Sequence, residues 1–313
     1  MKINAGMMIV GAVITGGCWS MASNKVSTAN AASTPIVEIS STPKPTPSKT
    51  SANTPTNANS DTSVMKDGST FAKNLATDFE YPTDDSGKLL MREYGSVFVA
   101  RGGAKPPSKV VFKDAADVDS YQASLDHTAA QIGGMKIDLQ TAALKALQEA
   151  IAEARTRNLT IGPRGGDSSR RGYKQTVDLW ASRVGPGLAH WTAAGKITSA
   201  DAARIKAMTP YQQVPEILKL ESQQIYFAKD LSKSIIYSVA PPGTSQHLSM
   251  LALDVKEFEN PQVRAILAKH GWFQTVTSDL PHFTFLGVSE SELPGLGLKR
   301  VDNSGRTFWV PDI

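Results

Sequence analysis

The sequence predicts an α+β domain, and two features of its second half carry that prediction. Between Asp138 and Thr156, apolar side chains recur every three or four residues, which is typical of a helix with one buried face. Short apolar runs of strand composition follow later in the chain, and 251–255 and 281–286 are the clearest of them. Helices followed by short strands indicate a small antiparallel sheet with flanking helices.

The remaining elements are expected from composition and turn residues. Pro261 stands where a first helical turn tolerates proline, and His270-Gly271 resembles a C-terminal cap, so the sequence predicts a helix over 261–269. Ser199 could cap the start of another helix. The other expected elements are strands at 96–99, 109–112, 159–161 and 234–238, helices at 173–180 and 200–208, and a loop at 163–171.

Residues 1–31 predict a leader for export. Lys2 precedes an apolar, Gly-rich stretch from Ala5 to Gly17 that is too short to span a bilayer, which needs roughly 20 apolar residues. Two interpretations stay open. Cys18 follows small residues as in a lipoprotein signal, in which the cysteine becomes acylated, whereas Ala29-Asn30-Ala31 is a cleavage signal that would remove Cys18. Both place the protein in the cell envelope, either periplasmic or anchored through a lipid on Cys18.

Residues 32–66 predict a disordered tether ahead of a globular domain at 67–313. Ser, Thr, Pro and Asn dominate this stretch, so it has too little apolar surface to offset the entropy of ordering. Since Cys18 is the only cysteine, the globular domain contains no disulfide. Its stability must come from packing, and a metal ion could add to it.

The charge balance argues against a nucleic-acid partner. The chain has 33 Lys and Arg against 29 Asp and Glu, and no block of basic residues with interleaved aromatics appears. A net charge of +4 is compatible with an anionic polymer such as a cell wall, although an ordinary solvated surface explains it as well.

Four residues near the C-terminus have the side chains of a hydrolytic zinc site. His247 and Asp254 are separated by six residues, which lets them converge if they lie on a strand and the loop before it, but not on one helix. His282 lies in an apolar strand, where a buried imidazole needs a partner or a metal. Two imidazoles and one carboxylate can hold Zn²⁺ and leave a position for water, and Asp279 offers a second carboxylate to take that water's proton.

The two motifs together resemble a known family. The pattern Ser-x-His-x-x-x-x-Ala-x-Asp, from Ser245 to Asp254, resembles the D-alanyl-D-alanine carboxypeptidase and VanY-type zinc peptidases. The second motif, Asp279-Leu-Pro-His-Phe, is similar to that of their phage endopeptidase relatives, Asp-x-Pro-His-Phe. The resemblance implies that His247, Asp254 and His282 are zinc ligands and that Asp279 is the general base.

The resemblance also implies an upstream arginine that binds the carboxylate of a peptidoglycan peptide substrate. Arg164 is the first choice because it keeps the family's Gly-x-Arg spacing after a strand, and Arg170 and Arg171 remain alternatives. A guanidinium suits this role because its planar fork can bind a carboxylate through two hydrogen bonds. Ser245 could bind substrate or orient His247, although a turn after Gly243 explains a serine equally well.

One residue departs from the family pattern. Met250 stands where the family usually has glycine, so a bulky side chain near the site is expected. The sequence therefore predicts an exported zinc hydrolase of peptidoglycan stem peptides, of the D,D-carboxypeptidase or endopeptidase type. The alternative, which Met250 favours, is a non-catalytic envelope protein of the same fold that binds stem peptides or a protein partner.

Overall fold

The computed structural model describes residues 68–313, and the fold described below is that of this segment. The leader, Cys18 and the tether predicted for 1–66 lie outside the described residues. All of 68–313 belong to one compact unit. Within it, no helix combines the length and the apolar character needed to cross a membrane.

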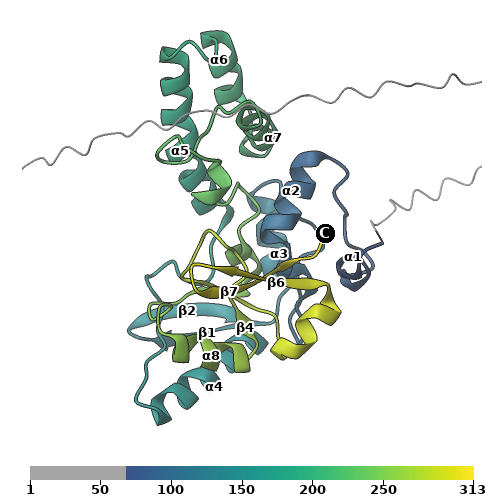
Figure 1. Cartoon of the computed structure of the whole chain (residues 1–313), viewed down its shortest axis with the longest axis vertical. Helices are drawn as coiled ribbons and strands as arrows, with labels where there is room; N and C mark the ends of the chain where they lie inside the picture. Colours follow the sequence, from purple (N-terminus) through teal and green to yellow (C-terminus); the bar gives the residue numbers. More distant parts are fainter. Residues whose placement is uncertain (1–67) are drawn as a thin grey trace, which may run out of the picture. The chain divides into compact units, whose positions relative to one another are not determined.

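The predicted α+β class is confirmed, because helices surround three small antiparallel sheets (Figure 1). The α-helices are α1 Thr70–Asn74, α2 Asp85–Tyr94, α3 Ala115–Ala123, α4 Thr141–Thr156, α5 Tyr173–Ala193, α6 Ser199–Ala207, α7 Pro210–Glu221 and α8 Pro261–Lys269. Four 3₁₀ segments are η1 Gly95–Val99, η2 Ile235–Tyr237, η3 Gln246–Ser249 and η4 Glu290–Leu296. The strands are β1 His127–Ile132, β2 Met135–Gln140, β3 Ala252–Asp254, β4 Trp272–Phe273, β5 His282–Phe285, β6 Leu298–Asn303 and β7 Arg306–Pro311.

The sheet that matters most for the site has the order β3-β5-β4, with both pairings antiparallel. Strand β5 lies in the middle and all four of its side chains are buried. The register places Leu253 opposite Phe283 and Asp254 opposite His282. Because successive side chains of a strand point to opposite faces, His282 and Thr284 share one face while Phe283 and Phe285 lie on the other.

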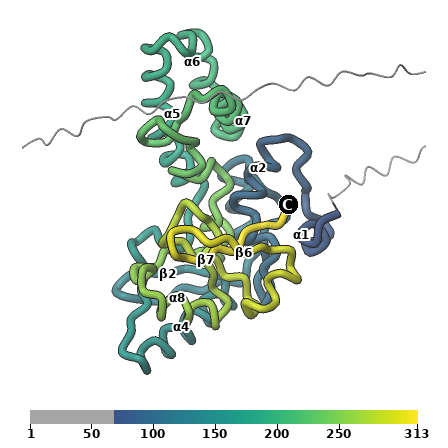
Figure 2. The backbone as a smooth tube through the Cα atoms, viewed as in Figure 1, coloured from purple at the N-terminus to yellow at the C-terminus, as the bar shows by residue number. Residues whose placement is uncertain are grey.

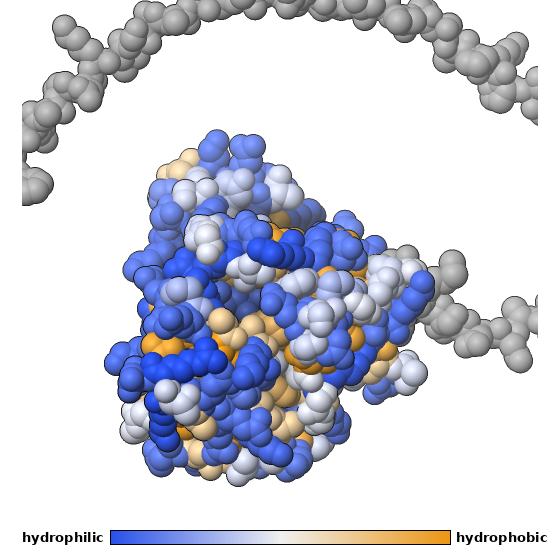
Figure 3. Space-filling view, turned by 60° about the horizontal axis from the view of Figure 1, so that its bottom comes forward, coloured by the Kyte–Doolittle hydropathy of each residue, from blue (hydrophilic) through white to orange (hydrophobic). Residues whose placement is uncertain are grey.

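Helices α4 and α8 pack against each other beside these strands (Figure 2). Helix α4 buries one face, with Ala143, Leu147 and Ala154 among its inward side chains. Helix α8 has the predicted bounds and begins as expected, because the Asn260 side chain accepts the backbone N–H groups of Gln262 and Val263 ahead of the proline turn. The face of the molecule drawn in Figure 3 is mostly hydrophilic with small apolar groups between.

Four predicted strands are wrong. Residues 95–99 and 235–237 form 3₁₀ turns, while 109–112 and 159–161 are irregular apart from a bridge between Glu80 and Lys109. Each of these four segments is a short apolar run. Such a run indicates that the segment is buried, but it does not determine the backbone conformation. The helix expected from Asp138 begins at Thr141, because 135–140 forms β2 of a hairpin that turns at Gly133-Gly134.

Helix α5 is much longer than the predicted 173–180. It continues through Gly185-Pro186-Gly187 to Ala193 and packs against α6, which in turn contacts α7. Gly187 is required there because an added Cβ would lie 2.4 Å from the ring of Phe227. At the end of α7, the buried Glu221 carboxylate accepts the backbone N–H groups of Phe227 and Ile235. These contacts hold the 234–240 segment beside α5.

We expect Gly243→Ala to destabilise the protein far more than Gly134→Ala does. Both glycines have φ of +79°, but a Cβ at Gly243 would lie 2.0 Å from the carbonyl oxygen of Phe112, while Gly134 has open space around it. Left-handed strain alone accounts for about 1–2 kcal/mol at Gly134, whereas the added backbone clash predicts a loss of roughly 3 kcal/mol or more at Gly243. Urea denaturation of the two variants measures the difference, and equal losses would contradict the clash.

Candidate metal centre

Three side chains that are far apart in the sequence meet at one end of the central sheet. Asp254 ends β3 and His282 begins β5, so antiparallel pairing puts them opposite each other. His247 lies on η3, which joins β3 through Met250 and Leu251. One ligand atom from each of the three side chains lies within 4.8 Å of the other two. The group therefore has the size of a metal site.

The Asp254 carboxylate lies between the two imidazoles. Its Oδ1 is 3.2 Å from Nε2 of His247 and 3.4 Å from Nδ1 of His282. The two rings meet edge to face, with centroids 4.9 Å apart. Oδ1 of Asp254 is thus the atom that both histidines approach.

The hydrogen bonds on the far side of each ring fix which nitrogen carries the proton. Nδ1 of His247 lies 2.7 Å from the carbonyl oxygen of Ser169, which can only accept, so in the neutral ring Nδ1 is protonated and Nε2 has a lone pair. Nε2 of His282 lies 2.9 Å from Oε1 of Gln246, which leaves the lone pair on Nδ1. Both lone pairs face the carboxylate.

Acceptors that face one another at this distance need a cation between them. Among the described residues, neither Nε2 of His247 nor Oδ1 of Asp254 has a hydrogen-bond partner, although both are buried. Two imidazole nitrogens and a carboxylate oxygen are the donor set of a three-ligand zinc site with one open position. The residues present therefore fit a zinc ion.

The charges also suit metal binding. Burial lowers the pKa of His247, so its ring is neutral at neutral pH. Burial alone would raise the pKa of Asp254, but the two histidines beside it outweigh that effect and hold the pKa of its carboxyl well below its usual range. Neutral imidazole and ionised carboxylate are the forms that bind metal.

Arg171 holds the second oxygen of the central carboxylate. Its Nη2 donates to Oδ2 of Asp254 at 2.7 Å, and its Nε donates to the carbonyl of Asp167 at 3.0 Å. This leaves Oδ1 directed at the histidines. The predicted loop at 163–171 also holds the backbone of Asp254, because the N–H of Asp254 donates to Ser168 O.

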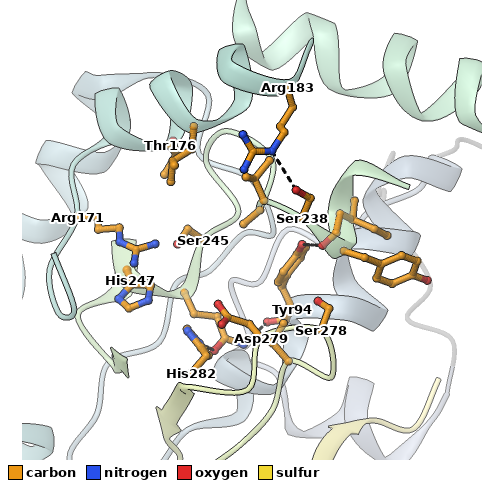
Figure 4. Close-up of a pocket in the computed structure, with 17 residues that line it drawn as sticks. Tyr94, Arg171, Thr176, Arg183, Ser238, Ser245, His247, Ser278, Asp279 and His282 are labelled. Carbon is orange, nitrogen blue, oxygen red and sulfur yellow. Dashed lines mark hydrogen bonds between the residues drawn. The ribbon is translucent and has the colours of Figure 1, made fainter. Parts of the chain in front are cut away.

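A pocket of about 250 Å³ opens beside His247 and His282 (Figure 4). Asp279 and Ser245, both proposed from the sequence as site residues, line it together with Arg171. Arg183 reaches it from α5 and donates from Nε to Ser238 Oγ at 3.0 Å. No carboxylate in residues 68–313 pairs with Arg183. The remaining lining residues include Tyr94, Thr176, Leu179, Ile236, Tyr237, Val239, Gln246, Val276 and Ser278.

The other two candidate arginines lie elsewhere. Arg164 lines a separate pocket with Lys256 and Glu257, although its backbone N–H donates to Asp254 O at 2.9 Å. The Arg170 side chain is directed to Gln122 and Asp138. Of the three arginines proposed from the sequence, Arg171 is the one that lines the metal pocket.

Met250 causes less disturbance than expected. It has φ of 57°, in the left-handed region where glycine is usual. Its side chain is fully buried and does not line the metal pocket. The methionine therefore accepts backbone strain without entering the pocket.

Several pocket residues escaped the sequence prediction. Thr176, Leu179 and Arg183 are spaced three and four apart, which places them on one helix face, but the predicted helix ended at 180. Tyr94 comes from the end of α2, and no pattern near it indicated a site. Helical spacing could have found Arg183, whereas Tyr94 required the fold.

Comparisons with known proteins add little to this geometry. No family model and no curated protein matches the chain. Two solved structures are similar to it: a mutant of the vancomycin-resistance D,D-pentapeptidase VanY from a VanB-type resistance cassette, in complex with Zn(II), and VanYB in complex with D-alanine-D-alanine. Each is 18% identical over 53% of this chain, covering 82% and 80% of the respective structures. The TM-score of 0.30 in both cases is too low to establish a shared fold.

We expect the purified protein to bind one zinc ion and His247→Ala to lose it. Removing one of three ligands leaves too few donors to hold the ion. Zinc at about 100 times its Kd should stabilise the wild type by roughly 2.7 kcal/mol against unfolding, and should leave His247→Ala unchanged. His190→Ala, an exposed histidine outside the site, is the matched control. Stoichiometric zinc in His247→Ala, measured by plasma mass spectrometry, would contradict the assignment.

Proposed function

We propose that this protein hydrolyses an amide bond in peptidoglycan stem peptides, with one zinc ion held by His247, Asp254 and His282. The observation that carries the proposal is the meeting of three lone-pair atoms beside a pocket whose lining includes a carboxylate and a guanidinium that form no ion pair within residues 68–313. A bound zinc ion supplies a lowered pKa for water and a polarised scissile carbonyl. The substrate class follows from the resemblance of the two motifs.

Asp279 is the proposed general base. It lines the pocket with an exposed side chain, and no ion pair within residues 68–313 engages it. The N–H of His282 donates to the carbonyl of Asp279 at 3.1 Å, so a tight turn keeps the carboxylate next to a metal-binding histidine. Its carboxylate would accept a proton from the attacking water and pass it to the leaving amine.

Tyr94 is a neighbour that does not compete for this role. Burial, then the negative charges of Glu93 and Asp279, raise its pKa well above the usual range. Its hydroxyl therefore stays protonated and donates to Ile236 O at 2.8 Å. Tyr94 is therefore a hydrogen-bond donor to the pocket wall and is not a rival base to Asp279.

Arg183 is the proposed carboxylate-binding residue in place of Arg164. Arg171 also lines the pocket, but Asp254 already occupies its guanidinium. Arg183 makes only neutral hydrogen bonds, to Ser238 and Ser182, so it can pair with a substrate carboxylate at no loss of an existing ion pair. Ser245 offers a hydroxyl in the same pocket. A pocket of about 250 Å³ suits a short peptide end with small side chains.

We expect Asp279→Asn to lower kcat on purified muropeptides by roughly 10²- to 10⁴-fold while zinc binding stays intact. The amide has the shape of the carboxylate but cannot take a proton. Mass spectrometry of products from a defined cell-wall digest measures the reaction and identifies the scissile bond, and the exposed Asp178→Asn on α5 is the control.

Two results would count against the reaction. Full activity in Asp279→Asn would remove the proposed base. A wild-type protein that holds zinc and binds muropeptides without cleaving any of them would select the non-catalytic binding protein instead.

We expect Arg183→Met to raise KM for a peptide with a free C-terminal carboxylate roughly ten- to hundredfold, with a much smaller change in kcat. Methionine keeps the aliphatic bulk and removes the charge. The same peptide with an amidated C-terminus should be a poor substrate for the wild type and should lose nothing further in the variant. Arg164→Met is the matched comparison, and a larger KM effect there than at Arg183 would favour the arginine chosen from the sequence.

A further inference from the structure

We propose that Gln246 is a positioning residue that fixes the tautomer of His282 and so keeps its Nδ1 lone pair directed at the metal site. The inference rests on the metal binding in the proposed function and is independent of the reaction. It concerns a residue between the two chain positions, Ser245 and His247, to which the motif gives roles.

The Gln246 side chain is 3% exposed, and both its amide oxygen and its amide nitrogen make hydrogen bonds. Oε1 lies 2.9 Å from Nε2 of His282 and also accepts from the hydroxyls of Thr284 and, at 3.3 Å, Thr275. Nε2 donates to the carbonyl of Tyr94 at 2.9 Å. Donors surround the oxygen and an acceptor faces the nitrogen, so the amide has one satisfactory orientation.

This orientation dictates the state of the imidazole. Because Oε1 accepts only, His282 must present Nε2–H to it, and Nδ1 is left with a lone pair 3.4 Å from Oδ1 of Asp254. In the opposite tautomer Nδ1–H would point at that carboxylate and hydrogen-bond to it. Such a contact would satisfy both atoms and occupy the place of a metal ion. By holding His282 in the other tautomer, Gln246 prevents a hydrogen bond between His282 and Asp254 that would compete with metal binding.

A neutral amide is a particular choice for this task. Metal-binding histidines usually donate to a carboxylate, a backbone carbonyl or water, and His247 follows that pattern with Ser169 O. An amide orients His282 equally well without adding a second negative charge beside Asp254, in a place where Thr275 and Thr284 are fully buried. The ligand group keeps a single ionised carboxylate.

Gln246 also ties distant parts of the chain to the site. It precedes His247 directly, so its backbone is part of the η3 turn that holds one ligand while its side chain holds the other. Through Tyr94 O it reaches the end of α2, and the Tyr94 hydroxyl donates to Ile236 O in the pocket wall. One amide thus joins both histidines to the segment that supports the pocket.

The test compares Gln246→Leu with Gln140→Leu in the full chain. Gln140 is 2% exposed, and its amide makes hydrogen bonds to Ser249 O and to the backbone of Lys105, with no contact to a metal-binding side chain. Zinc affinity is measured by competition with a chelator. The ring tautomer of His282 is measured by ¹⁵N NMR on the zinc-free protein.

We expect Gln246→Leu to weaken zinc binding roughly ten- to hundredfold and to move His282 away from the Nε2–H tautomer. Gln140→Leu should keep zinc affinity within about threefold of the wild type, even where it lowers stability by a similar amount. Gln246→Glu keeps an acceptor for His282 and should preserve its Nε2–H tautomer, which also decides the matter if Gln246→Leu does not fold.

Three results would overturn the inference: zinc affinity unchanged in Gln246→Leu, an equal loss in Gln140→Leu, or an Nδ1–H tautomer in the zinc-free wild type. Failure of the proposed reaction looks different. A wild type that binds zinc, shows the Nε2–H tautomer and cleaves no muropeptide would remove the reaction and leave the role of Gln246 intact.

Discussion

The site depends on one constraint: three buried acceptor atoms are held face to face with no proton left to place between them. Among the described residues, Nε2 of His247 and Oδ1 of Asp254 are buried without a hydrogen-bond partner. Nδ1 of His282 is turned toward the same carboxylate, because the other nitrogen of each ring is bound to a carbonyl or amide oxygen. Without a cation this arrangement is unfavourable, since buried polar atoms normally have hydrogen-bond partners. Favourable packing of the surrounding residues must therefore offset the cost of these unpartnered acceptors. A bound metal ion would remove that cost.

The support comes from backbone geometry more than from local side-chain preference. The β3–β5 register sets Asp254 against His282, and the left-handed turn at Met250 returns the chain from η3 to β3 so that His247 faces the same point. A non-glycine residue in that conformation carries strain of roughly 1 kcal/mol or more. Met250 is fully buried, so its packing can offset that strain.

Sequence patterns predicted the residues that belong to short local motifs. They missed the residues whose contacts form only when distant segments of the chain come together in the fold. His247, Asp254 and His282 were found because two short motifs carry all three, and the α8 bounds were found because Asn260 and Pro261 fix its start locally. The hydrogen-bonding role of Gln246 was not predictable, since its partners include Tyr94 and Thr284, which only the tertiary structure brings to it. Arg164, which the sequence favoured, lines a different pocket. Its selection rested on spacing after a predicted strand, and such spacing does not show which face a side chain takes.

The two arginines that line the pocket differ in whether a carboxylate compensates their charge. Arg171 balances the single negative charge of Asp254, so the ligand group together with Arg171 is close to neutral and would leave a bound dication's charge largely undiminished at the scissile bond. Arg183 keeps its charge uncompensated on the opposite wall. Asp279 adds the one exposed negative charge in the pocket. Under the proposed function, the uncompensated charge of Arg183 suits a peptide carboxylate, and the ion pair with Asp254 is why Arg171, despite being nearer to the ligands, is the poorer candidate for substrate binding.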